Sequence, residues 1–311
     1  MSDHASDQGW VGRLLAQLRR DLDPEELRRR SRYPASPLWS SQVMLDEPHL
    51  VTAAHRDFID AGARVITVNT YSATPQRLAR DSDPGLFESL HAAALSAART
   101  ACDESGKDVL IAGCLPPLVA SYRPDVAPDD ATCLRDYRRM VETQAAGVDL
   151  FVCETMSLAR EAHAATVAAA ESKLPVWTAF TVDDGDGTRL RSGESLAEAA
   201  RDVVDAGAER VLVNCAMPEA VTTAMAEIAG LGVPFGGYAN GFTSVAPLQP
   251  GRTVDSLESR TDLDPVAYAE HALGWVEQGA TIVGGCCEVG PAHIAALAER
   301  LTAAGYRLVS S

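Results

Sequence analysis

Residues 277–287 read EQGATIVGGCC and contain two features that decide the predicted fold. The glycine at position 279 ends a helical pattern, and a short apolar run follows it at once. Because glycine accepts the left-handed backbone conformation that commonly ends a helix, the stretch predicts a helix followed directly by a buried strand. That strand would end in two glycines and two adjacent thiols, Cys286 and Cys287.

The same helix–glycine–strand unit recurs along the chain. Helical patterns end at Gly62, Gly147 and Gly207, and each of these glycines is followed within three residues by an apolar run. Three more apolar runs fit the series. The seven predicted strands lie at residues 64–70, 108–114, 149–154, 175–180, 210–215, 234–240 and 280–287. Their nearly continuous apolar character is typical of a parallel sheet that is covered by helices.

The N-terminal part of the chain contains no strand as clear as these. Residues 10–30 have helical periodicity instead. The apolar residues on or near one stripe are Val11, Leu14, Leu15, Leu18, Leu22 and Leu27. Seven strands and one weak N-terminal candidate match an α/β fold of the (β/α)8 type, a TIM barrel, in a single domain. A doubly wound open sheet is the alternative, but no G-x-G-x-x-G motif follows an early strand.

The domain organisation follows from this strand count. We expect residues 1–33 to form an N-terminal extension and an atypical first barrel segment, and residues 34–311 to form the rest of the barrel. No linker or change in composition divides the chain.

Charge and composition exclude several classes of function. The 311 residues carry a formal net charge of -16, which argues against a surface for nucleic acid or for an anionic membrane. No apolar run is long enough to cross a membrane, and the N-terminus has no apolar signal segment. The seven cysteines lack the spacing of a small disulfide-rich domain, so we expect a reducing, cytoplasmic setting. The sequence does not decide between a monomer and a homo-oligomer.

The functional face of such a barrel is formed by the carboxyl ends of its strands. Cys215 ends one predicted strand and the pair Cys286 and Cys287 ends another, so three thiols should meet on this rim. Three thiolates that leave one position open are typical of a catalytic zinc site. For Cys215 taken alone, core packing is the alternative, because cysteine is among the most buried residue types.

Other strand ends on the same rim carry polar side chains. We take five of them as candidates for substrate contacts: Asn69, Thr70, Glu154, Asn214 and Asn240. A structural, hydrogen-bonded carboxylate is the alternative for Glu154. Cys114 also ends a strand, and we interpret it as part of the pocket lining. An acidic loop at residues 183–187 lacks the glycine and the glutamate that a calcium-binding loop requires, so we interpret it as a solvated loop.

Several motifs resemble those of the zinc-dependent homocysteine S-methyltransferase family. GGCCEVGPAHI at residues 284–294 is similar to the C-terminal signature of that family, and VNC at residues 213–215 is similar to its first-thiolate motif. The segments with further similarity are residues 37–71, 111–125, 149–155 and 236–242. The resemblance therefore covers roughly residues 35–300, in order.

The resemblance implies a fold, a metal and a reaction. The fold would be a (β/α)8 barrel, in agreement with the strand count. Cys215, Cys286 and Cys287 would bind Zn²⁺, and Glu154 would receive the amino group of homocysteine. A methyl group would pass from S-methylmethionine, S-adenosylmethionine or betaine to the homocysteine thiol, giving methionine. The sequence does not select one of these donors.

One segment departs from the family pattern. Members of the family open with a strand that ends in Asp-Gly-Gly, whereas Arg20, Asp21 and Leu22 stand at that spacing here. Asp21 is the candidate for the family's aspartate, displaced by one position, and both glycines are absent. The alternative function is therefore a catalytically impaired or repurposed zinc- or thiol-binding protein that acts on another thiol or selenol. A dithiol redox role for Cys286 and Cys287 is a third hypothesis.

Overall fold

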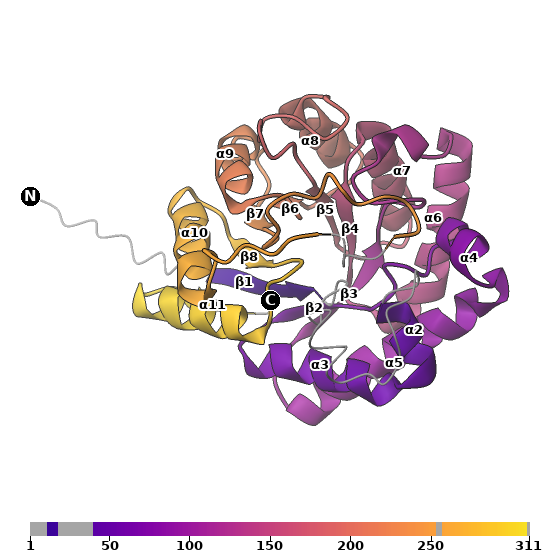
Figure 1. The fold of residues 1–311 in the computed structure, drawn as a ribbon, viewed down its shortest axis with the longest axis horizontal. Coiled ribbons are helices and arrows are strands. Elements are labelled where there is room, and N and C mark those ends of the chain that lie inside the picture. The colour runs from indigo at the N-terminus through magenta and orange to yellow at the C-terminus, as the bar shows by residue number, and fades with distance from the viewer. Residues whose placement is uncertain (1–10, 18–39, 253–256, 310–311) are drawn as a thin grey trace, which may run out of the picture.

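Eight parallel strands close into a barrel, because β1 (Val11–Gln17) pairs with β8 (Ile282–Gly285) on one side and with β2 (Val65–Thr67) on the other. This computed structural model describes residues 11–17, 40–252 and 257–309 (Figure 1). The remaining strands follow in chain order around the barrel. They are β3 (Leu110–Leu115), β4 (Leu150–Met156), β5 (Val176–Phe180), β6 (Arg210–Asn214) and β7 (Phe235–Tyr238). The predicted TIM barrel is confirmed.

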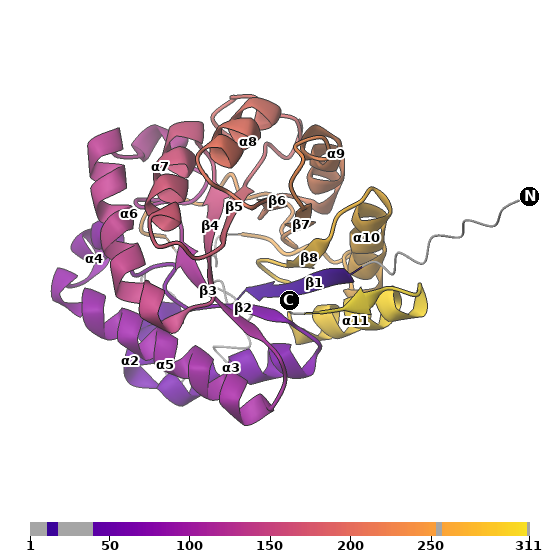
Figure 2. The same cartoon turned by 180° about the vertical axis from the view of Figure 1, so that it is seen from behind.

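Helices surround the strands on the outside of the barrel, as Figure 2 shows from the opposite side. Their bounds are α2 (Ser40–Asp46), α3 (Pro48–Asp60), α4 (Pro75–Asp81), α5 (Phe87–Ser105), α6 (Asp130–Gln144), α7 (Ala159–Ala170), α8 (Leu196–Asp205), α9 (Pro218–Ile228), α10 (Pro265–Glu277) and α11 (Pro291–Ala303). A short strand β9 (Arg307–Leu308) pairs with the start of β1. Within the described part of the chain, no helix combines the length and apolarity that crossing a membrane requires.

The seven strands predicted from apolar runs are all present, and the glycines before three of them behave as expected. Gly62, Gly207 and Gly279 have φ angles of 116°, 113° and 104°. Gly147 does not follow this pattern, because α6 ends instead in a 3-10 turn, Ala145–Gly147. The prediction of a left-handed glycine is therefore wrong at that position.

The helical periodicity of residues 10–30 was misleading over Val11–Gln17, which form strand β1. The backbone of Leu15 aligns with Val65 on β2 and with Gly284 on β8. A strand at this place pairs with the backbone N–H and C=O groups on the facing edges of β2 and β8, which a helix would leave unpaired. Barrel closure therefore outweighs the local helical pattern. Residues 18–39, which include the predicted displaced aspartate Asp21, lie outside the described residues.

The buried side chains form two clusters. One fills the space between the sheet and the helices, and the other fills the barrel interior and reaches its carboxyl end. The interior cluster contains Trp177 and Leu212 from the strands, together with the three cysteines predicted to bind metal. The loop between β7 and α10 contributes Phe242, Val245 and Leu248 to the same cluster. This β7–α10 loop (239–252 and 257–264) runs across the barrel in orange in Figure 1.

Candidate metal centre

Three sulfur atoms meet at the carboxyl end of the barrel, as predicted. Cys215 follows β6 directly, and Cys286 and Cys287 follow β8 directly. Their three Sγ atoms all lie within 4.8 Å of one another, and all three residues are buried. The Cys215 and Cys287 sulfurs are 3.7 Å apart, and those of Cys286 and Cys287 are 4.0 Å apart. Parallel strand ends thus bring together thiols that are 71 positions apart in sequence.

A disulfide joins Cys215 to Cys286 in this structure. This bond was not predicted from the sequence, and Cys287 beside it forms no disulfide. The thiolate, not the disulfide, is the form of cysteine that binds metal. The cluster can therefore hold a metal ion with three sulfurs only after the Cys215–Cys286 bond has been reduced.

The donor set fits a tetrahedral metal ion that prefers sulfur. Ligand sulfurs around zinc lie about 3.8 Å apart, because each Zn–S bond is about 2.3 Å long. The two distances between sulfurs that are not bonded to each other, 3.7 Å and 4.0 Å, are close to this value. Three cysteines would leave one of four tetrahedral positions for another ligand.

Backbone hydrogen bonds hold the three cysteines in place. Cys215 has a left-handed backbone, with φ of 50°, and its N–H donates to the carbonyl of Tyr238. The N–H of Cys286 donates to the carbonyl of Ala239, and the carbonyl of Cys287 accepts from the N–H of Gly241. The end of β7 and the segment after it therefore contact the backbone of all three.

Tyr268, on α10, supports the same strand ends and was not singled out from the sequence. Its hydroxyl donates to the carbonyl of Gly284 over 2.6 Å and accepts from the N–H of Ala239 over 3.0 Å. Burial raises the pKa of this phenol above its usual range. No sequence signal identifies it, because tyrosine on the buried side of a helix is ordinarily core packing.

Glu154, on β4, is fully buried at the rim. Its Oε1 accepts a hydrogen bond from the thiol of Cys114 over 2.9 Å. Thr155, the next residue, has a left-handed φ of 58° and is held by Asn214. The Asn214 side-chain oxygen accepts from Thr155 N–H, and its nitrogen donates to Thr155 Oγ1, both over 2.9 Å. Asn214 thus fixes the end of β4 beside Glu154.

The other predicted substrate contacts also lie at strand ends. Asn69 and Thr70 follow β2 and are buried. Among the described residues, the Thr70 hydroxyl has no hydrogen-bond partner, and neither does the side-chain nitrogen of Asn240. The oxygen of Asn240 accepts from Phe242 N–H. Buried polar atoms without partners are uncommon in folded proteins, which makes Thr70 and Asn240 suited to bind a polar ligand.

The acidic loop at residues 183–187 is tied to the barrel through Asp184. This carboxylate accepts from the N–H of Met217 over 2.8 Å and forms an ion pair with Arg191 over 3.0 Å. Arg191 also donates to Oγ1 of Thr181, whose hydroxyl donates to the carbonyl of Cys215. The loop is therefore more than a solvated segment, because its contacts continue to the cysteine cluster.

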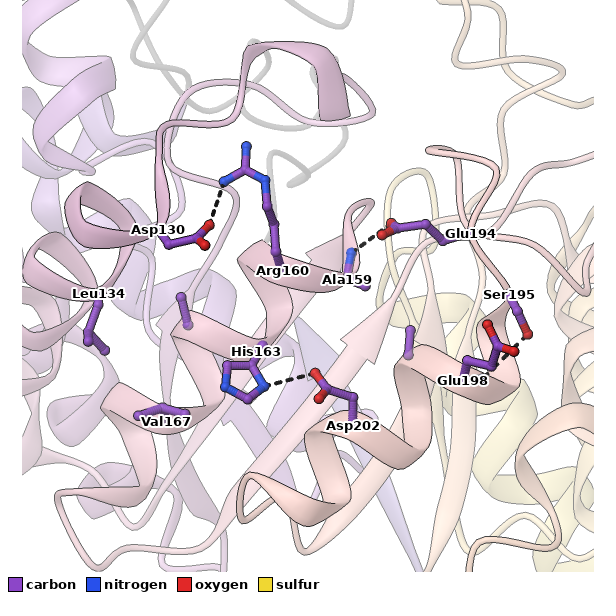
Figure 3. A pocket seen from close by; sticks show the side chains of 12 residues that line it. Asp130, Leu134, Ala159, Arg160, His163, Val167, Glu194, Ser195, Glu198 and Asp202 are labelled. Atoms are coloured by element: carbon purple, nitrogen blue, oxygen red, sulfur yellow. Dashed lines mark hydrogen bonds and ion pairs between the residues drawn. The ribbon is translucent and has the colours of Figure 1, made fainter.

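A separate groove lies on the outside of the barrel between α6, α7 and α8 (Figure 3). It has a volume of about 540 Å³ and carboxylates along its walls. His163 and Asp202 form one pair across it, over 2.8 Å, and Arg160 and Asp130 form another, over 3.1 Å. None of the predicted site residues lines this groove.

Comparison with known proteins gives a consistent result. The family model described as homocysteine S-methyltransferase matches residues 24–301. A homocysteine S-methyltransferase of Escherichia coli strain K12 is 30% identical over 298 residues, covering 88% of this chain and 92% of the relative. A selenocysteine methyltransferase of Astragalus bisulcatus is 29% identical, covering 92% of this chain and 90% of that protein.

Solved structures of the homocysteine methyltransferase MmuM from Escherichia coli have the same fold. The metallated form superposes with a TM-score of 0.76 at 26% identity, covering 93% of this chain and 96% of that one. The oxidized form superposes with a TM-score of 0.74, also at 26% identity, covering 93% of this chain and 95% of that one.

Proposed function

The chain belongs to the homocysteine S-methyltransferase family, and we propose that it transfers a methyl group to the thiol of homocysteine, giving methionine. The donor would be a sulfonium or ammonium compound: S-methylmethionine, S-adenosylmethionine or betaine. In the transfer, the acceptor sulfur forms a bond to the methyl carbon while the bond between that carbon and the donor sulfur or nitrogen breaks. The thiol proton passes to solvent, and the donor leaves with the electron pair of the broken bond.

The observation that carries this proposal is the cluster of three buried cysteines at the carboxyl end of the barrel. We propose that Cys215, Cys286 and Cys287, in their reduced form, bind Zn²⁺. When bound, zinc would lower the pKa of the acceptor thiol, so that it is present as a nucleophile at neutral pH. The need for reduced cysteines agrees with the predicted cytoplasmic location.

The remaining residues of the rim would orient the acceptor. The carboxylate of Glu154 would receive the ammonium group of homocysteine, since a buried carboxylate is stabilised by an opposite charge. The Thr70 hydroxyl and the side-chain nitrogen of Asn240, which have no partner in the described structure, would contact the polar end of homocysteine together with Asn69. Asn214 would act indirectly: both ends of its amide bind Thr155, and this holds the backbone beside Glu154 in place. Holding the acceptor and the donor in the correct relative orientation lowers the entropic cost of the reaction.

A selenol acceptor is a second candidate. It is supported by the similarity to the selenocysteine methyltransferase of Astragalus bisulcatus over nine-tenths of the chain. The same cysteine cluster would serve either acceptor, because selenium and sulfur share the preference for a soft metal. The alternative is a binding protein instead of an enzyme: a member of the family that binds zinc or thiols but transfers no methyl group.

Metal analysis together with a methyl-transfer assay tests the proposal. Protein purified under reducing conditions should contain about one zinc ion per chain. It should form methionine from homocysteine with at least one of the three donors, and selenocysteine should be assayed beside homocysteine. Cys287→Ala should lose the metal and slow methyl transfer by about 100-fold or more, because two sulfurs hold zinc poorly.

The matched control is Cys102→Ala, since Cys102 is a buried free thiol on α5, away from the rim. It should keep both metal and activity. A folded, reduced wild-type protein that takes up no zinc would refute the metal proposal. One that binds zinc and homocysteine but methylates neither acceptor from any donor would favour the non-catalytic alternative.

A further inference from the structure

The thiol of Cys114 contacts the carboxylate that is proposed to bind the substrate ammonium. Cys114 lies on β3 and Glu154 on the neighbouring strand β4, and the Sγ–Oε1 distance is 2.9 Å. Both side chains are buried. A hydrogen bond to one carboxylate oxygen restricts rotation of the whole carboxylate group, so Cys114 does more than line a pocket.

Gln144, at the end of α6, holds the backbone of Cys114 from the other side. Its side-chain oxygen accepts from Cys114 N–H over 2.9 Å, and its side-chain nitrogen donates to the Cys114 carbonyl over 3.2 Å. Because both ends of one amide bind the same residue, neither can turn alone. Gly113 allows this close approach, since a Cβ there would lie 3.2 Å from the Gln144 oxygen and 2.5 Å from the Phe151 ring.

These contacts form one continuous chain from α6 to the rim. Gln144 fixes the backbone of Cys114, and the Cys114 thiol fixes Glu154. The side chain of Gln144 is itself fully buried, so water does not compete for its hydrogen bonds. The direction of the Glu154 carboxylate is thus set by contacts that begin at Gln144 on α6 and pass through Cys114 on β3.

We infer that Cys114 is a positioning residue, which orients the Glu154 carboxylate toward the ammonium group of the acceptor. The inference rests on the proposed function, in which Glu154 receives that ammonium. It assigns Cys114 an effect on acceptor recognition and none on metal binding, since its sulfur is not part of the three-sulfur cluster. The consequence is selectivity for thiols that carry an amino group.

Calorimetric binding of two acceptors tests this inference. Homocysteine and 4-mercaptobutanoate differ only in the amino group, so the ratio of their dissociation constants measures how well the ammonium is recognised. Cys114→Ala should weaken homocysteine binding by about tenfold, as expected for the loss of a hydrogen bond to a charged group. Binding of 4-mercaptobutanoate should change by less than about twofold, because it makes no contact through an ammonium.

Two further variants distinguish positioning from a structural effect. Cys114→Ser retains a donor and should restore most of the selectivity, although its shorter side chain reaches less far. Cys153→Ala is the matched control, because Cys153 directly precedes Glu154 on β4, so the two side chains point to opposite faces of the strand. It should leave both dissociation constants unchanged. Should Cys114→Ala fail to fold, Cys114→Val fills the space without a donor.

The outcomes separate this inference from the proposed reaction. Equal weakening of both acceptors in Cys114→Ala, or no weakening of either, would overturn it. So would a wild-type protein that binds the two acceptors equally well. A wild-type protein that prefers homocysteine and loses this preference in Cys114→Ala, yet transfers no methyl group, supports the inference and refutes only the reaction.

Discussion

Left-handed backbone at residues other than glycine is concentrated at the carboxyl end of the barrel. Thr155, Cys215 and Glu288 have φ angles of 58°, 50° and 64°. Such conformations cost on the order of 1–3 kcal/mol each and persist where the surroundings determine them. Here Asn214 holds Thr155, the Tyr238 carbonyl holds Cys215, and the Ser259 hydroxyl binds the Glu288 carboxylate. The strain therefore lies beside the residues that are proposed to bind metal and substrate.

Two buried histidines should make the protein sensitive to mild acid. Burial lowers the pKa of His55 to about 3 and that of His91 to about 4, against an ordinary value of 6.5. Because the folded state resists protonation, stability is fully present above pH 6.5 and is lost as the pH falls below it. At pH 5 each histidine should cost about 2 kcal/mol. Burial raises the pKa of the Glu161 carboxyl, which offsets part of this loss in the more acidic range.

Urea unfolding at pH 7 and pH 5 measures this loss. In the described structure neither ring nitrogen of His55 has a hydrogen-bond partner, so His55→Leu removes a titrating group without removing a bond. That variant should lose about 2 kcal/mol less than the wild type between the two pH values. His49→Leu, at an exposed position on the same helix, should lose as much as the wild type. Equal losses in all three proteins would contradict the assignment to His55.

At the scale of elements, the β7–α10 loop connects the helices to the cysteine cluster. Arg260 anchors this loop, because the guanidinium binds Glu219 on α9 over 2.8 Å and Asp262 over 2.7 Å. The backbone N–H of Arg260 donates to the carbonyl of Gly241, and Gly241 N–H donates to the carbonyl of Cys287. Loss of the Arg260 side chain should therefore loosen the segment next to the proposed metal ligands.

Arg260→Ala should lower the free energy of unfolding by about 1 kcal/mol, since its partners are partly exposed. It should also make the loop more sensitive to limited proteolysis and lower the zinc content, because Gly241, which Arg260 contacts, binds Cys287. The control is Arg300→Ala, which removes a similar pair with Glu270 between the outer helices α10 and α11. The control should lose comparable stability without either effect. An unchanged cleavage rate in Arg260→Ala would show that Arg260 does not hold the loop.

The sequence predicted those elements whose signals are local. Apolar runs marked seven strands, and placing Cys215, Cys286 and Cys287 at strand ends was enough to bring them together on one rim. The contacts of Gln144 with Cys114 and of Tyr268 with Gly284 were beyond reach, because they depend on which side chains face one another after packing. The Cys215–Cys286 disulfide was likewise unpredicted, because two cysteines that lie close together can either form a disulfide or bind one metal ion.

At the scale of the whole molecule, strand β1 shows why local pattern was insufficient. Residues 11–17 read VGRLLAQ, in which Val11, Leu14 and Leu15 have helical spacing and only the valine is β-branched. The strand forms because β8 and β2 would otherwise present open edges on either side of it. The need for a strand at this place arises from the closure of the eight-stranded barrel, and the seven residues of β1 do not indicate it by themselves.

Closure by β1 should therefore be essential for both stability and metal binding. Leu15 is aligned with β2 on one side and β8 on the other, and its N–H belongs to a ladder between parallel strands. Leu15→Pro removes that N–H and should cost about 3 kcal/mol or more, whereas Leu15→Val keeps it and serves as the control. Because Cys286 directly follows β8, an opened seam should also lower zinc content, measured beside the unfolding free energy. A Leu15→Pro protein with wild-type stability and zinc content would show that the barrel holds its metal site without a closed β1–β8 seam.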